Sequence, residues 1–209
     1  LAFKQISSEQ ALKVLVKVPA LTEPSLTANS FNTRLQDAPQ SGQSFMEVSR
    51  IRALRGPNLW SRQTSIEAIV SCEPQEREMM PGNEFEKQLR RIFPSLGPLE
   101  GTRPGQPASM AHALEKITLS LQNQAGCPIT FSRTTATEEE GIYQVVVQYT
   151  EEAVGRLALE WAEKLCLAVK TQTAFDLNQA LTELRDLDED VRLGPSTGSI
   201  VDAAVLKGI

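Results

Sequence analysis

The order of apolar and polar residues after Met46 predicts strands alternating with helices. Strict alternation is typical of strands, and apolar residues three and four apart are typical of helices. We expect strands at 48–54, 65–72, 128–135 and 142–150, and helices at 83–93, 110–125, 152–170 and 177–187. This pattern predicts an α+β fold: a small, mostly antiparallel sheet packed by helices, with a helical linker at the C-terminal end.

Residues with strong turn and capping preferences mark the ends of these elements. The Gly56-Pro57-Asn58 segment breaks the first strand, and Pro94 ends the first helix. Ser109 can cap the next helix and Gly126 can end it in the left-handed conformation. An acidic loop, 138–141, separates the last two strands. The expected strands are therefore joined by turns rather than by crossover helices alone.

The composition changes at Met46, which suggests a domain boundary. Residues 1–45 include a stretch rich in Pro, Ser, Thr, Asn and Gln with few large apolar groups, so we expect a disordered tail or an upstream extension, with Met46 as the true start. Residues 46–171 form the expected α+β domain, and 172–209 a linker into a further domain.

Charge, cysteine count and hydropathy exclude several classes of function. The formal net charge of -5 argues against a dedicated nucleic-acid binder. The three cysteines Cys72, Cys127 and Cys166 lack zinc-site spacing and are odd in number, which favours buried, reduced thiols in a cytoplasmic protein. No apolar run approaches the roughly 20 residues of a membrane-spanning helix, so no membrane partner is expected.

Four segments together carry a resemblance to a known family. They are RALRGPNLWS (52–61), CPITFSRT (127–134), GIYQVVVQYTEE (141–152) and DEDVRLGPSTGSIVDAA (188–204). In this order and spacing they resemble cyanophycin synthetase, from Met46 to the end of the chain. Bacterial enzymes of this family use ATP to build a storage polymer with an aspartate backbone and arginine on each side-chain carboxylate.

The resemblance implies an N-terminal domain plus the entry into an ATP-grasp domain. Both ligase active sites, with ATP and magnesium, would lie beyond Ile209, so we expect this segment not to be catalytic by itself and to need no cofactor. The implied partners are the cyanophycin polymer or primer, the protein's own downstream ligase domains and, in the full protein, further copies in a homo-oligomer. The implied role is to hold the growing polymer near the active sites, where tethering raises its effective concentration.

Charged residues near two predicted turns are candidates for polymer binding. Guanidinium groups pair well with the carboxylates of an aspartate polymer, and acidic residues could accept from its arginines. The candidates are Arg50, Arg52, Arg55, Arg62, Glu138, Glu139 and Glu140. Arg50 and Arg52 lie two apart, on one face of the first strand. The alternative is that both charge clusters are ordinary solvated surface.

The helix 110–125 carries a degenerate metal motif. Some family members have HxxEH here, with two imidazoles for zinc and a glutamate base, and an associated peptidase activity that makes primers. In this chain the pattern is His112, Glu115 and Lys116, and there is one histidine in all. An ammonium is a poor metal ligand, so we expect no metal and a helix-surface His112 near Glu115.

Three further features have competing interpretations. The GPSTGS loop (194–199) could bind an anion before a short helix, but it lacks the Walker lysine, and a linker turn is the simpler interpretation. Trp60 and Trp161 are expected to be core or interface anchors rather than stacking platforms.

A polymer-cutting metallopeptidase and a purely structural docking domain remain as alternatives to a polymer-holding domain.

Overall fold

The computed structural model describes residues 45–192, 203–204 and 206–207. The chain divides into two units, residues 1–43 and 44–209, and every described residue belongs to the second. The predicted tail, residues 1–45, lies outside the described residues except for Phe45. The GPSTGS loop (194–199) also lies outside them.

Four antiparallel strands form one sheet in the order β1-β2-β4-β3. Their bounds are Glu47–Leu54 (β1), Ser65–Ser71 (β2), Ser132–Ala136 (β3) and Ile142–Gln148 (β4). Two hairpins, β1-β2 and β3-β4, meet where β2 pairs with β4. Together with the helices, this sheet confirms the predicted α+β fold.

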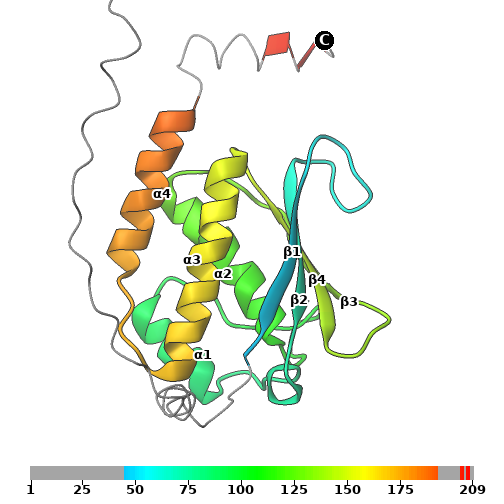
Figure 1. The fold of residues 1–209 in the computed structure, drawn as a ribbon, viewed down its shortest axis with the longest axis vertical. Coiled ribbons are helices and arrows are strands. Elements are labelled where there is room, and N and C mark those ends of the chain that lie inside the picture. The colour runs from blue at the N-terminus through cyan, green and yellow to red at the C-terminus, as the bar shows by residue number, and fades with distance from the viewer. Residues whose placement is uncertain (1–44, 193–202, 205, 208–209) are drawn as a thin grey trace, which may run out of the picture. The chain divides into compact units, whose positions relative to one another are not determined.

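The helices lie on one face of the sheet (Figure 1). They are α1 (Glu84–Ile92), α2 (Met110–Ala125), α3 (Glu152–Thr171) and α4 (Leu177–Val191), with a short 3-10 helix η1 (Pro74–Glu76) before α1. Helices α2 and α3 contact the strands, and α4 packs against α2 and α3. One core results, in which Leu114 and Ile117 of α2 and Val70 of β2 are fully buried, as the helical and strand periodicities predict.

The predicted strand 128–135 begins late, at Ser132, because side chains already satisfy the backbone before it. Asn123 accepts from the backbone N–H of Ile129 and donates to its carbonyl. The Oε1 atom of Gln148 accepts from the N–H groups of the next two residues, Thr130 and Phe131. Backbone groups satisfied in this way need no strand partner.

The predicted helix 177–187 is longer than expected and ends at Val191. The last turn of α4 is polar in sequence, but its residues have a structural role. Asp188 is buried and forms an ion pair with Arg192. Arg192 also donates to the carbonyl of Gly126, just after α2. Charged side chains therefore fix the end of α4 against α2.

Strand β1 contains one residue that has no opposite residue in the register with β2. Val48 and Arg50 pair with adjacent residues of β2, so Ser49 between them is the extra residue of a bulge. Because side chains alternate along a strand, the bulge lets Val48 pack against the core while Arg50 and Arg52 face the other side of the sheet. The prediction that these two arginines share one face is confirmed, and their face is the one without helices (Figure 1).

No helix in the described part of the chain is long and apolar enough to cross a membrane. The three cysteines are free thiols and are buried. Burial raises the pKa of the Cys72 thiol to about 11. The thiols are therefore held in the unreactive protonated form at neutral pH.

Candidate functional site

The helix-free face of the sheet carries a cavity of about 520 Å³. Its wall combines strand residues with residues from the β1-β2 and β3-β4 loops: Arg50, Trp60, Ile69, Thr135, Ala136, Thr137, Glu138 and Gln144. Arg50 and Glu138 are both exposed, and neither forms an ion pair within the described residues. The cavity thus brings one available cation and one available anion to the same place.

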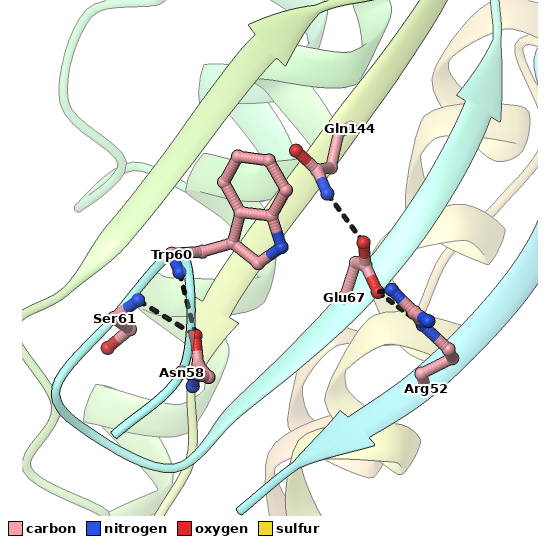
Figure 2. A network of polar contacts seen from close by, with 6 residues as sticks. All are labelled: Arg52, Asn58, Trp60, Ser61, Glu67 and Gln144. Atoms are coloured by element: carbon pink, nitrogen blue, oxygen red, sulfur yellow. Dashed lines mark hydrogen bonds and ion pairs between the residues drawn. The ribbon is translucent and has the colours of Figure 1, made fainter. Parts of the chain in front are cut away.

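The loop that carries Trp60 is held by Asn58. The Asn58 Oδ1 atom accepts from the backbone N–H groups of Trp60 at 2.9 Å and Ser61 at 2.8 Å (Figure 2). Its Nδ2 atom donates to the carbonyls of Gly56 and Gln63. These four bonds fix the conformation of the loop. The Trp60 side chain, which is 37% exposed, is therefore held in place as one side of the cavity.

A buried carboxylate lies beside this wall. Glu67 is only 2% exposed although it lies on the helix-free face, opposite Arg52 in the strand register. Arg52 Nε donates to Glu67 Oε2 at 2.5 Å, and Gln144 Nε2 donates to Oε1 at 2.5 Å (Figure 2). Both oxygens therefore have a donor, as a buried charge requires. The guanidinium of Arg52 is committed to Glu67 and is not available to a ligand in the way that Arg50 is.

The remaining predicted binding residues lie outside the cavity. Arg55 is 3.7 Å from the carboxylate of Glu152 at the start of α3. Glu140 accepts from Arg77 Nη1 at 2.6 Å. Two further charges are exposed and do not line the cavity: Arg62 and Glu139. Of the seven candidates, the structure brings Arg50 and Glu138 together at the cavity, and Arg52 lies on the same face outside it.

The motif residues at the start of α2 line a second cavity, of about 210 Å³. His112 closes a capping box, in which its Nδ1 atom accepts from the backbone N–H of Ser109 at 3.1 Å. Glu115 Oε1 accepts from the hydroxyl of Ser132 at 2.6 Å. Lys116 Nζ donates to the carbonyl of Pro98 at 2.7 Å. Each of the three side chains thus supports the local structure.

Comparisons with known proteins agree with the resemblance found in the sequence. The family model of the cyanophycin synthase-like N-terminal domain matches residues 70–171. Residues 70–171 belong to this family. Cyanophycin synthetases of Geminocystis herdmanii, Trichormus variabilis and Synechocystis are 37%, 34% and 33% identical to it. These alignments cover 78%, 78% and 76% of this chain but 20% of each relative, so the chain spans about a fifth of the length of the relatives it matches.

The residues of this cyanophycin synthase-like domain do not fit a catalytic zinc ion. Because the Nδ1 atom of His112 accepts a backbone hydrogen bond, the proton of the neutral imidazole sits on Nε2, which is buried and has no partner in the described structure. Burial also lowers the pKa of His112, which keeps the ring neutral. A protonated Nε2 offers no lone pair to a metal, and Lys116 replaces the second imidazole. The described residues hold no cluster of three or more His, Cys, Asp or Glu side chains arranged for a metal.

The expectation that His112 lies on the helix surface is wrong. The ring is half-buried, packs edge to face against Tyr143 at 6.2 Å, and caps its own helix. A half-buried imidazole at the third helical position is a reasonable substitute for the glutamate of a capping box, because its Nδ1 atom can accept the same backbone hydrogen bond.

Three residues of the site were not among the predicted binding residues: Trp60, Glu67 and Gln144. The expectation that Trp60 is an anchor in the core or an interface is wrong for the core, because the ring lines an open cavity. A tryptophan in a polar turn segment was the available signal. The pairing of Glu67 with Arg52 depends on strand register, which alternation alone does not give.

Proposed function

We propose that this domain holds cyanophycin on the helix-free face of its sheet, as the polymer-binding module of a longer, ATP-dependent cyanophycin-synthetase-like ligase. In this proposal aspartate and arginine are added in downstream domains, which also bind ATP and magnesium. The segment itself makes no bond. Its contribution is to keep the end of a long polymer close to the ligase sites, where tethering raises the effective concentration of that end.

One observation carries the proposal: Arg50 and Glu138 line a single cavity and neither has a charged partner within the described residues. A polymer of aspartate and arginine presents carboxylates and guanidinium groups along the same chain. A guanidinium fork on the protein suits the first, and a carboxylate suits the second. A surface of one sign would attract half of these groups and repel the other half.

Retention on immobilised cyanophycin tests the proposal. The complete 209-residue chain should be retained in buffer of low ionic strength and released as salt approaches about 0.15 M or more, where charges separated by more than about 8 Å are screened. The double variant Arg50→Ala/Glu138→Ala should be retained less. The matched control Arg62→Ala/Glu139→Ala also removes one positive and one negative charge, here from the β1-β2 and β3-β4 loops outside the cavity, and should behave as the unmodified chain.

Two results would contradict the proposal. No retention of the unmodified chain even in dilute buffer would exclude polymer holding and would favour a domain that only docks the ligase domains. Equal loss in both double variants would mean that surface charges in general, not this cavity, attract the polymer.

The wider setting of the domain follows from the same proposal. Its partners are the polymer or primer and its own downstream ligase domains, and the full protein assembles as a homo-oligomer in the cytoplasm. A reducing cytoplasm suits a protein whose three cysteines are free thiols.

A further inference from the structure

The cavity offers an aromatic surface that the protein itself leaves open. The indole of Trp60 lines it together with Ile69. In the described structure, lysines lie over the rings of Trp161 and Phe45, whereas the Trp60 ring has no such contact. Planar guanidinium groups stack well on exposed indole rings, because the ring face is electron-rich and the cation is weakly hydrated.

Hydrogen-bond acceptors lie next to this ring. The Gln144 side chain lies between Glu67 and Trp60 (Figure 2), and its amide nitrogen is used by Glu67. The amide oxygen is left as an acceptor on the side of the indole. Glu138 adds a carboxylate from the β3-β4 loop. A guanidinium carries five N–H donors and no acceptor, so it can satisfy both groups at once.

Arg50 supplies the opposite charge at the same cavity. We infer that the cavity binds one arginyl side branch of the polymer, with the guanidinium stacked on Trp60 and hydrogen-bonded to Glu138 and Gln144, and the α-carboxylate paired with Arg50. A volume of about 520 Å³ lies within the range of small-molecule sites. This inference rests on the proposed function and names the part of the polymer that is recognised.

The ion pair between Arg52 and Glu67, beside the cavity, supports the assignment of an arginyl side branch. Because Glu67 already holds Arg52 and the Gln144 amide nitrogen, the orientation of the Gln144 amide is fixed before a ligand arrives. Preorganised polar groups lose little entropy on binding, which is how a shallow site can still be selective.

A fluorescence titration tests the inference. The protein has two tryptophans, so the full chain with Trp161→Phe reports on Trp60 alone. Trp161 Nε1 has no hydrogen-bond partner within the described residues, so phenylalanine removes no bond there. N-acetylarginine, which copies the amide-linked arginine of the polymer, should change Trp60 emission saturably. N-acetylcitrulline, which has the same shape without the positive charge, should bind at least about tenfold more weakly.

One more ligand and two variants locate the charges. N-acetylagmatine, which lacks only the carboxylate, should bind more weakly than N-acetylarginine to the unmodified site. In Arg50→Gln the two ligands should bind equally well. Glu138→Gln should weaken N-acetylarginine by about tenfold, the amount expected for one charge-assisted contact. Arg62→Gln and Glu139→Gln are the controls and should leave binding unchanged. Calorimetry on the unsubstituted chain repeats the titration without relying on Trp161→Phe.

Equal binding of N-acetylarginine and N-acetylcitrulline, or no change at Trp60, would overturn the inference. If the polymer is still retained on the column in that case, the proposed function survives and the recognised part lies elsewhere. Tighter binding of free arginine than of N-acetylarginine would overturn the assignment to a polymer branch and favour the free amino acid. Arginine binding with no retention of polymer would refute the proposed function itself.

Discussion

The pair formed by Arg52 and Glu67 gives a test that separates stability from binding. In Arg52→Ala, the Glu67 carboxylate, which is 2% exposed in the unmodified chain, keeps only its bond from Gln144. Removing one partner of a fully buried ion pair costs about 3–5 kcal/mol. Because the Arg52 side chain is 50% exposed, water can take over part of its role, and we expect a loss of about 2 kcal/mol. For a domain of this size the melting temperature should fall by roughly 4–8 °C.

Thermal and urea unfolding followed by circular dichroism measure this effect. The double variant Arg52→Ala/Glu67→Gln should recover about half of the loss, because a neutral amide can still accept from Gln144 and leaves no unpaired charge. Arg50→Ala is the matched control and should stay within about 0.5 kcal/mol of the unmodified chain.

Polymer retention should show the reverse order, with Arg50→Ala weakening it more than Arg52→Ala. The reasoning is refuted if Arg52→Ala is as stable as the unmodified chain, or if the double variant is no more stable than the single one.

Two further predictions concern the helices. Burial lowers the pKa of His112 below 6.5, so the unfolded chain binds a proton first as the pH falls, and the free energy of unfolding should decrease from about pH 6.5 downward. His112→Gln, which can keep the capping box, should flatten this slope in urea unfolding at pH 5–8, and an unchanged slope would contradict the assignment. In Gly155→Ala the new Cβ would lie 2.8 Å from Tyr149 Cβ and 3.0 Å from Ile66 Cδ1. Overpacking of about 1–3 kcal/mol should outweigh the roughly 1 kcal/mol gained in helix propensity, and a higher melting temperature would contradict this.

Local sequence rules account for most of the fold. The apolar stripes of 110–125 and 152–170 and the alternation of 65–72 predicted helices and a strand that the structure contains. The differences occur where a side chain takes over a backbone role from a distance, as Asn123 and Gln148 do before β3, and Arg192 at the end of α4. Propensity describes a residue and its neighbours, so it does not register partners that the fold brings close.

The sequence predicted a site formed by charged side chains, but it did not predict which residues form it. Alternation placed Arg50 and Arg52 on one face, and the acidic loop was visible, but nothing local distinguishes Arg50 from Arg62 or Glu138 from Glu139. Their roles separate only when the loop of Trp60 folds over the sheet and the register sets Glu67 opposite Arg52. These are long-range outcomes of packing.

The extra residue Ser49 makes one position of β1 free to disappear without reversing the strand. Without it, Val48 would still lie opposite Val70 and Arg50 opposite Ile69, now in a regular ladder, so Val48 would keep facing the apolar layer and both guanidinium groups would keep facing outward. A deletion between Arg50 and Leu54 is different, because it would turn the side chains on one side of the deletion to the opposite face. Relatives of this domain can therefore differ in length at Ser49 and keep the same charged face.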